Sequence, residues 1–138
     1  MDKNSQTPIL EVKNLKQYFY PTRKFTVKAV DGISFKIMPG ETYGLVGESG
    51  SGKSTTGRAI IRLYDPTDGQ IIFEGEDITG KMSKKALKTL RTKMAMIFQD
   101  PMACLNPRKK VIDIIAQGFD IHHDYKDEKE REEKVYKI

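Results

Sequence analysis

Residues 42–64 read TYGLVGESGSGKSTTGRAIIRLY. The segment from Gly47 to Ser54 matches the phosphate-binding pattern G-x-x-x-x-G-K-[ST]. The apolar run Thr42–Val46 in front of it is typical of a short strand buried on both faces of a sheet. The apolar spacing from Ala59 to Tyr64 behind it predicts a helix, which Asp65-Pro66 would end. A strand, a glycine-rich loop and a helix in this order are the context that the pattern requires, so the sequence predicts an α/β fold.

The chemistry expected of this loop follows from its residue types. Glycines at 50 and 52 let successive N–H groups point at one cluster of phosphate oxygens without side-chain clashes. The helix that begins near Lys53 adds unpaired N–H groups and a positive dipole end, and the Lys53 ammonium reaches the β- and γ-phosphates. The Ser54 hydroxyl is placed to ligate Mg²⁺, and Thr55 to hydrogen-bond on the α-phosphate side. The predicted binding residues are Gly47, Glu48 (expected to point outward), Ser49, Gly50, Ser51, Gly52, Lys53, Ser54 and Thr55.

The composition limits the classes of protein to which the chain can belong. It has 138 residues, a net charge of +5 and 38% hydrophobic residues, which is ordinary for a globular protein. The longest apolar run, Met94–Phe98, is far shorter than the roughly 20 residues of a membrane-spanning helix. No apolar block of signal-peptide length follows the N-terminus. We therefore expect a cytoplasmic domain, and the dispersed charge gives no reason to expect nucleic acid as a partner.

The remaining patterns predict elements on both sides of the loop. Alternating apolar residues indicate strands at Ile9–Leu15 and Ile33–Ile37, and a second buried strand is expected at Met94–Phe98. The helix expected around Met82–Leu90 has a basic opposite face, to which the sequence assigns no role. The other expected elements are a hairpin of Gln70–Phe73 with Asp77–Ile78, a helix from Val111 to Phe119, and a solvated helix after Tyr125 with pairs such as Glu130 and Lys134.

Two further features help to discriminate among proteins with such a loop. Tyr18, Phe19 and Tyr20 form an aromatic cluster that can supply a ring for stacking on a base, although any one ring could equally pack in the core. Gln99 follows the expected strand Met94–Phe98, and a neutral amide there can coordinate Mg²⁺ or hold a water molecule. About 40 residues of strand pattern precede the loop, which favours an added β subdomain over a small P-loop kinase.

Together these residues resemble the ATP-binding subunit of an ABC transporter, in the form seen in oligopeptide and dipeptide importers. LVGESGSGKST at 45–55 is similar to the Walker A segment of that family, and IFQDPMACLNPR at 97–108 is similar to its Q-loop. AVDGISFKIMPGETYGLVGESG at 29–50 is similar to the same subgroup. The resemblance implies a partial P-loop NTPase core of the ABC ATPase type, with an antiparallel β subdomain in residues 1–100. It also implies that residues 101–138 hold the Q-loop and the start of a truncated helical subdomain.

The resemblance also assigns roles to single residues. It implies that Phe19 stacks on adenine, with Tyr18 as the neighbouring alternative. It makes Gln99 the sensor of the γ-phosphate, in contact with Mg²⁺ and the attacking water. Lys53 and Gln99 are then the expected catalytic residues, Ser54 and Gln99 the metal ligands, and ATP with Mg²⁺ the cofactors.

The function implied by the resemblance is ATP hydrolysis coupled to import of oligopeptides or dipeptides. Two such subunits would sandwich ATP and act on membrane permease subunits at the inner face of the cell membrane. The 138 residues contain no LSGGQ-like signature, no apolar strand ending in Asp-Glu and no switch histidine after a strand. We therefore expect this chain to bind ATP without hydrolysing it alone. Because its helical pattern runs to Ile138, we expect a truncation that exposes a sheet edge and promotes self-association.

Two other functions are compatible with the residues. A small P-loop kinase would need an acceptor site and an arginine-rich lid, neither of which can be placed in this sequence. A non-catalytic module that responds to nucleotide would need only the phosphate-binding loop.

Overall fold

The structure, a computed structural model, describes residues 7–138. These residues form two compact units, the first ending at Met96 and the second running from Ile97 to Ile138. Each unit is described by itself below. The division into domains 1–100 and 101–138 expected from the sequence stays a prediction.

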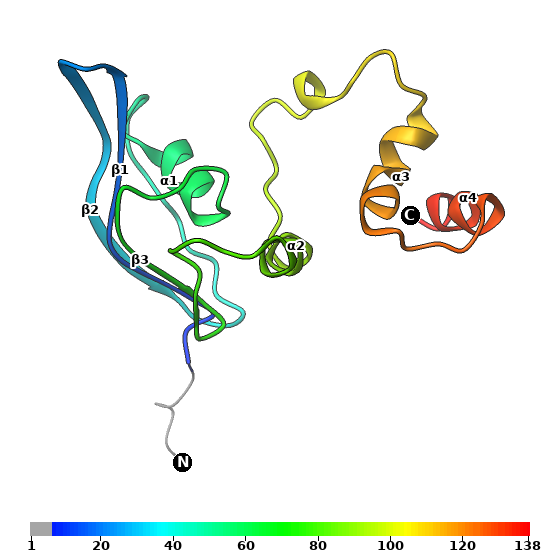
Figure 1. Cartoon of the computed structure of the whole chain (residues 1–138), viewed down its shortest axis with the longest axis horizontal. Coiled ribbons are helices and arrows are strands. Elements are labelled where there is room, and N and C mark those ends of the chain that lie inside the picture. Colours follow the sequence, from blue (N-terminus) through cyan, green and yellow to red (C-terminus); the bar gives the residue numbers. More distant parts are fainter. Residues whose placement is uncertain (1–6) are drawn as a thin grey trace. The chain divides into compact units, whose positions relative to one another are not determined.

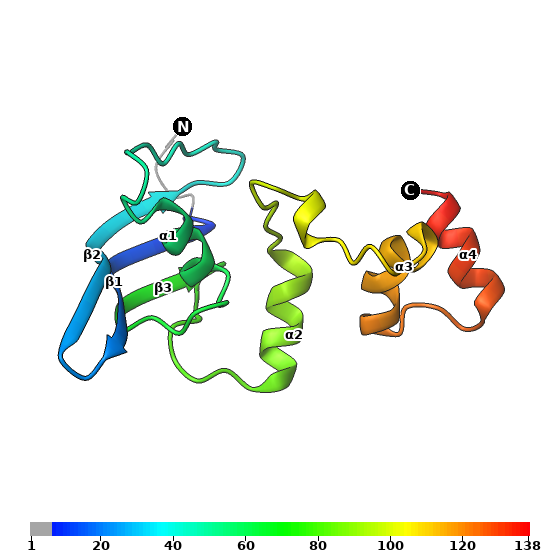
Figure 2. The ribbon, with the colours of Figure 1, turned by 90° about the horizontal axis from the view of Figure 1, so that it is seen from above.

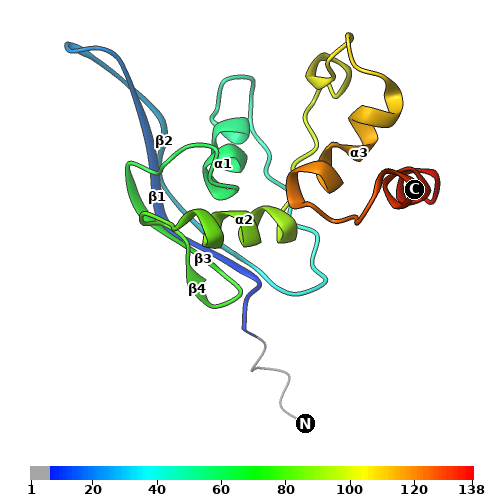
Figure 3. The same cartoon turned by 45° about the vertical axis from the view of Figure 1, so that its right-hand side comes forward.

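The first unit is built on a four-stranded antiparallel sheet (Figure 1). Its strands are β1 (Leu10–Thr22), β2 (Phe25–Ile37), β3 (Asp68–Phe73) and β4 (Glu76–Asp77), in the order β2-β1-β3-β4. β1 is central and pairs with β2 on one side and β3 on the other. The strands and the hairpin predicted from alternation are confirmed, and β1 and β2 continue beyond their predicted ends into a long hairpin that extends past the sheet (Figure 3).

The core of this unit lies between the sheet and helix α1 (Lys53–Ile60). Leu15 and Ile71 are fully buried sheet residues, and Ala59 and Ile60 of α1 join the same cluster. Figure 2 shows α1 lying over one face of the sheet. Burying a Leu or Ile side chain contributes about 1.5–3 kcal/mol, so this contact fixes the C-terminal end of α1 against the sheet.

Helix α2 (Lys84–Lys93) completes the first unit and confirms the helix predicted around Met82–Leu90. Ser83 caps it, because the Ser83 hydroxyl accepts the Ala86 N–H at 3.1 Å. Leu90 is buried in the core cluster with the sheet residues. The apolar side of α2 is therefore its attachment to the sheet.

The sequence predicts two buried strands that the structure does not contain, so these two predictions are wrong. Neither Thr42–Val46 nor Met94–Phe98 forms a strand, and the side chains of Val46 and Ile97 are 94% and 89% exposed. A strand exists only as part of a ladder, and no described residue pairs with either segment. Both segments stay unpaired although their composition suits a central strand.

The second unit contains a 3₁₀ turn, η1 (Met102–Cys104), and the helices α3 (Val111–His122) and α4 (Glu128–Tyr136). Both helices were predicted, and the Glu130–Lys134 pair is present at 3.6 Å. Arg131 of α4 joins the two helices through Asp113 and Asp120 of α3. Across residues 7–138, no helix combines the length and the apolar character needed to cross a membrane.

Candidate nucleotide-binding site

The segment Thr42–Val46, which enters the phosphate-binding loop, is held by aromatic stacking and not by strand pairing. The Tyr43 ring stacks on Phe35 of β2 with centroids 4.9 Å apart and an interplanar angle of 13°. A turn precedes it, in which the Glu41 N–H donates to the Met38 carbonyl at 3.1 Å. The segment thus runs beside β2 and delivers Gly47 to the loop without main-chain pairing.

The loop lies directly against β2, and one glycine makes this approach possible. Gly52 has φ +91°, and a Cβ atom there would lie 2.2 Å from the Ala29 carbonyl oxygen. Gly50 also has positive φ, at +80°, but a Cβ atom there would meet nothing within 4 Å. The open space beside Gly50 is what a concave phosphate cradle requires, whereas Gly52 is needed for the contact with the sheet.

The start of α1 is uncapped. Its N-cap residue is Gly52, which offers no side-chain acceptor, and its first turn contains no acid. The first intrahelical bond runs from the Thr56 N–H to the Gly52 carbonyl at 2.8 Å. The amides of Lys53, Ser54 and Thr55 therefore have no intrahelical acceptor and carry the positive end of the helix dipole.

The Lys53 ammonium folds back over the loop. Its Nζ donates to the carbonyls of Gly47 at 2.7 Å and Glu48 at 2.5 Å, and it lies 3.3 Å from the Ser51 hydroxyl. All three acceptors are neutral, so they position the ammonium without cancelling its charge. Because an ammonium has three donors and the Ser51 contact is long, one donor can turn to an anion while both carbonyl bonds are kept.

A cavity of about 260 Å³ lies beside the loop on its β2 side. The Val30 and Ile33 side of β2 forms one wall, and Gly47, Ser51 and Lys53 form the other. Asp31 also lines it and is its only carboxylate among the described residues. The cavity therefore has a mostly apolar lining that includes one cation, Lys53, and one carboxylate, Asp31.

The two aromatic candidates for base stacking are both engaged in other contacts. The Tyr18 hydroxyl donates to Asp31, and the Lys28 ammonium lies 5.3 Å from the centroid of the Tyr18 ring. The bond to Asp31 raises the pKa of Tyr18 and lowers that of Asp31. Phe19 makes a T-shaped contact with Tyr64 at 5.3 Å. Both rings are half-buried, and the choice between them stays a prediction.

Gln99 does not belong to the same unit as the loop. It lies in the second unit and is exposed, in a bend that follows the unpaired segment Met94–Phe98. The reason for which the sequence singled it out, its place at the end of a buried strand, is therefore wrong. Its proposed contact with Mg²⁺ and water stays a prediction. In the structure, the predicted residues Gly47 to Thr55 form one loop and the first turn of α1, and Glu48 is exposed.

Sequence reasoning missed three contributors to the site. The Ala29 carbonyl sets how closely the loop approaches the sheet, and the Phe35 ring holds Tyr43. Thr56 is buried, and its hydroxyl donates to the Gly52 carbonyl at 3.0 Å, which steadies the first turn of α1. The alternation of apolar residues in β2 could have indicated Phe35, but a backbone carbonyl leaves no signal in sequence.

Comparison with known proteins decides the family. The ABC transporter family profile matches residues 30–138, which include the loop, α1 and everything after it. The chain is a member of the ABC transporter family. Proteins of this family bind ATP with Mg²⁺, and the uncapped helix start and cationic loop described above fit a triphosphate.

Curated relatives place this ABC transporter chain beside peptide transport proteins. It is 58% identical over 130 residues to the oligopeptide transport ATP-binding protein OppF of Bacillus subtilis (strain 168), covering 94% of this chain and 42% of OppF. It is 47% identical over 144 residues to the oligopeptide transport ATP-binding protein AppF of the same strain, covering 100% of this chain and 44% of AppF. The chain thus spans less than half the length of these relatives.

A solved structure supports the same fold. The ATP-binding cassette MJ0796, in a dimeric post-hydrolysis state bound to ADP and Pi, superposes with a TM-score of 0.78 at 22% identity. The match covers 93% of this ABC transporter chain and 54% of MJ0796. The predicted fold, a partial P-loop NTPase core with an antiparallel β subdomain, is confirmed.

Proposed function

We propose that this chain is the nucleotide-binding portion of the ATP-binding subunit of a peptide importer, and that it binds Mg-ATP through Gly47–Thr55. One observation carries the proposal. The Lys53 ammonium is held by the neutral carbonyls of Gly47 and Glu48 at the open start of α1, so a fixed positive charge and unpaired amides converge on one place. Such a site fits a polyanion and nothing uncharged.

Each residue of the loop has a defined part in this binding. The amides of Lys53, Ser54 and Thr55 donate to phosphate oxygens, because they have no acceptor inside the helix. The Lys53 ammonium turns its third donor from the Ser51 hydroxyl to the β- and γ-phosphates. The space beside Gly50 admits the phosphates to the backbone. Glu48 is exposed, and we expect its carboxylate to point away from the phosphates.

Other assigned residues act around this cradle. Mg²⁺, when bound, neutralises charge on the phosphates, and the exposed Ser54 hydroxyl and the Gln99 amide are its proposed protein ligands. Phe19 is the proposed platform for adenine, and Tyr18 is the alternative. Phe19 is favoured because the Tyr18 ring already has the Lys28 ammonium over it and its hydroxyl on Asp31.

The proposed role of the whole protein is peptide import. The names of OppF and AppF, both oligopeptide transport ATP-binding proteins, support this cargo class. The proposal includes a second ATP-binding subunit, membrane permease subunits and a place on the inner face of the cell membrane. The dimeric state of MJ0796 supports the first of these.

The 138-residue chain is proposed to bind ATP without appreciable turnover. Its sequence holds the phosphate-binding loop but no LSGGQ segment and no apolar strand ending in Asp-Glu. The carboxylate that the resemblance expects to activate the attacking water is therefore not among these 138 residues. Ground-state phosphate binding does not need that group.

Calorimetry with Mg-ATP tests the proposal. The chain should bind with measurable heat, and Lys53→Met should weaken binding about 100-fold. The thermal midpoint should change little, because the carbonyls that Lys53 bonds lie in an exposed loop and can bond water in its place. Lys129→Met on α4 removes an exposed lysine of the same charge and is the matched control. Equal affinities in Lys53→Met and the parent would overturn the site.

A phosphate-release assay on the same samples separates the alternatives. Phosphate release no faster than in the buffer control agrees with binding without turnover. Transfer of the γ-phosphate to an added acceptor would favour a kinase. Turnover by the chain alone, lost in Lys53→Met, would contradict the proposed lack of hydrolysis but keep the binding site.

A further inference from the structure

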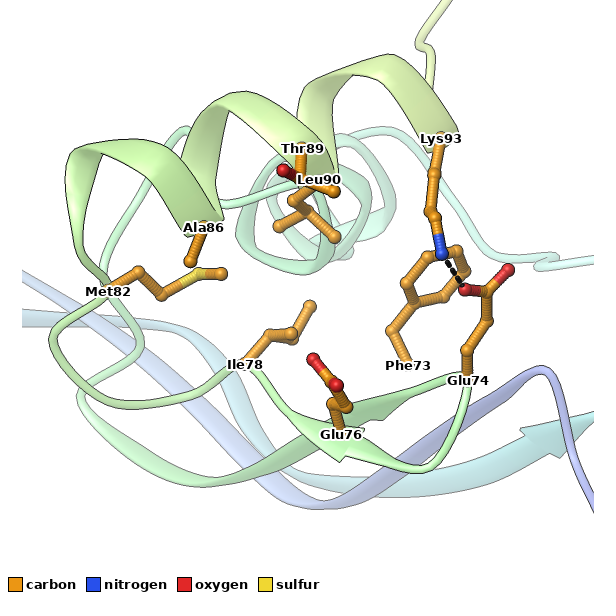
Figure 4. A pocket seen from close by; sticks show the side chains of 9 residues that line it. All are labelled: Phe73, Glu74, Glu76, Ile78, Met82, Ala86, Thr89, Leu90 and Lys93. Carbon is orange, nitrogen blue, oxygen red and sulfur yellow. Dashed lines mark hydrogen bonds and ion pairs between the residues drawn. The ribbon is translucent and has the colours of Figure 1, made fainter.

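Helix α2 has two faces, of which the fold uses one. Figure 4 shows Met82, Ala86 and Leu90 directed toward Phe73 and Ile78 of the β3–β4 region, around a cavity of about 200 Å³. At the edge of the same face, the Lys93 ammonium pairs with Glu74. The inner face of α2 is therefore occupied by the unit's own sheet.

The outer face carries four cations. Lys84, Lys88 and Arg91 stand at i, i+4 and i+7, which places them in one row along a helix, and Lys85 stands beside the row. All four side chains are exposed. We call these four residues the basic face of α2. Within residues 7–138, none of the four has an acidic partner in an ion pair or a side-chain hydrogen bond.

This lack of pairing sets the basic face apart from the sheet around it. All four lysines of the sheet strands lie against a carboxylate even though they are partly exposed. The paired sheet lysines are Lys13 and Lys36 with Glu11, Lys16 with Asp68, and Lys28 with Asp31.

The arrangement also works against the stability of α2. Lys84 and Lys85 lie in the first turn, where the helix dipole favours acids, and that turn contains none. Lys84 and Lys88 are like charges at i and i+4, which repel. The dipole favours Arg91 in the last turn, but folding gives no reason for the cations of the first turn, and an anionic partner would remove both of their penalties.

We propose that the basic face of α2 binds the anionic headgroups of a phospholipid membrane. The row from Lys84 to Arg91 is about 10 Å long at 1.5 Å per residue, so several headgroups can be contacted together. The apolar residues of α2 are held in the core, so the contact is electrostatic, without insertion, and salt-sensitive. The choice of lipid over other polyanions rests on the proposed function, which places the protein at the inner face of the membrane.

Vesicle flotation with the 138-residue chain tests this proposal. Vesicles of phosphatidylcholine with about one-quarter phosphatidylglycerol should carry the chain at about 0.05 M salt and release it at about 0.5 M, and pure phosphatidylcholine should not carry it. The triple variant Lys84→Gln, Lys88→Gln, Arg91→Gln should bind the anionic vesicles at least about tenfold more weakly.

A matched triple variant separates a specific face from net charge. Lys24→Gln, Lys129→Gln, Lys137→Gln removes the same three charges from exposed positions elsewhere, and its binding should change less than about twofold. Equal losses in the two triple variants, or no binding by the parent, would overturn the proposal. So would tighter binding of single-stranded DNA than of anionic vesicles through the same residues.

Two measurements on the α2 triple variant exclude trivial explanations. Its thermal midpoint should be close to that of the parent, since loss of Lys84 removes a charge that opposes the dipole and repels Lys88, while loss of Arg91 removes a charge that the dipole favours in the last turn. Its affinity for Mg-ATP should be unchanged, since none of the three residues belongs to the phosphate-binding loop. Lipid binding that fails while Mg-ATP binding persists disproves the membrane face and leaves the proposed function intact.

Discussion

Helices α1 and α4 begin in opposite ways. α1 begins after Gly52, which supplies no acceptor, and its first turn contains no acid. α4 begins after Asp127, whose carboxylate accepts the Glu130 N–H at 2.9 Å, and the Glu130 carboxylate accepts the Lys126 N–H at 2.9 Å. In α4 the chain itself thus satisfies one first-turn amide and places carboxylates at the positive end of the dipole, whereas in α1 both are left open.

The cation near each helix start repeats this difference. Lys53 is held by neutral carbonyls and keeps its charge available. Arg131 is only 8% exposed and donates to Asp113, Asp120 and Glu128, so its charge is fully compensated and its pKa is raised further. The proposed anion site at α1 therefore lacks both the cap and the counter-charge that the start of α4 receives. The following four experiments change the start of α1 or of α4 and measure whether the difference between them persists.

Gly52→Ala should have the largest effect. The new Cβ atom would meet the Ala29 carbonyl oxygen at 2.2 Å and would hold an alanine at φ +91°, so the loop must leave β2. We expect a loss of about 3 kcal/mol in unfolding free energy, with Mg-ATP binding abolished in calorimetry. Gly50→Ala is the control, because its φ is similar but its Cβ atom has room. Equal costs in the two variants would refute the role of the Ala29 contact.

Thr55→Glu should convert the open start of α1 into a closed one. A carboxylate in the first turn satisfies the free amides and the dipole, which should raise the unfolding free energy by about 0.5 kcal/mol. The same charge should repel the phosphates and weaken Mg-ATP binding about 100-fold, measured by calorimetry. Thr55→Gln has similar size without the charge and should bind more tightly than Thr55→Glu. Equal affinities would show that the open dipole is not what attracts the nucleotide.

Asp127→Ala makes the reverse change in α4. Removal of the cap leaves the Glu130 N–H unpaired and should cost about 1 kcal/mol, seen as faster amide hydrogen exchange in α4 by mass spectrometry. Mg-ATP affinity should not change. Asp124→Ala is the control, since Asp124 is mostly exposed and forms only a surface pair with Lys134. Exchange as slow in Asp127→Ala as in Asp124→Ala would contradict the capping role.

Acid should weaken the packing of α4 on α3, and we expect this to be the smallest of the four effects. Hydrogen bonding from Arg131 lowers the pKa of Asp120 below its ordinary value of 3.8. A carboxyl group with a lowered folded-state pKa contributes stability above its unfolded pKa and loses it as the pH falls toward the folded value. Helical circular dichroism should therefore show α3–α4 losing resistance to urea below about pH 4. In Arg131→Met this acid-dependent part should be smaller; an unchanged pH profile would argue against the Arg131–Asp120 link.

Local sequence patterns predicted most elements correctly. Period-two alternation found β1 and β2, and apolar spacing found α2 and α3. It also found α1, although α1 ends at Ile60 and not at Asp65-Pro66, so Leu63 and Tyr64 lie outside the helix. These predictions succeeded because each depends on residues near one another in the chain. The strands expected at Thr42–Val46 and Met94–Phe98 failed because a strand also needs a partner, which composition does not supply.

The sequence by itself predicted a loop suited to a polyanion in front of a helix, because glycines, a lysine and hydroxyl residues in that spacing are typical of phosphate binding. Only the tertiary structure decided how the loop is held. The Ala29 carbonyl lies where no side chain at Gly52 would fit, and the Phe35 ring anchors Tyr43 in place of a ladder. The tertiary structure also decided which cation is neutralised. Lys53 and Arg131 both lie near the start of a helix, and only packing determines whether a carbonyl or a carboxylate contacts them.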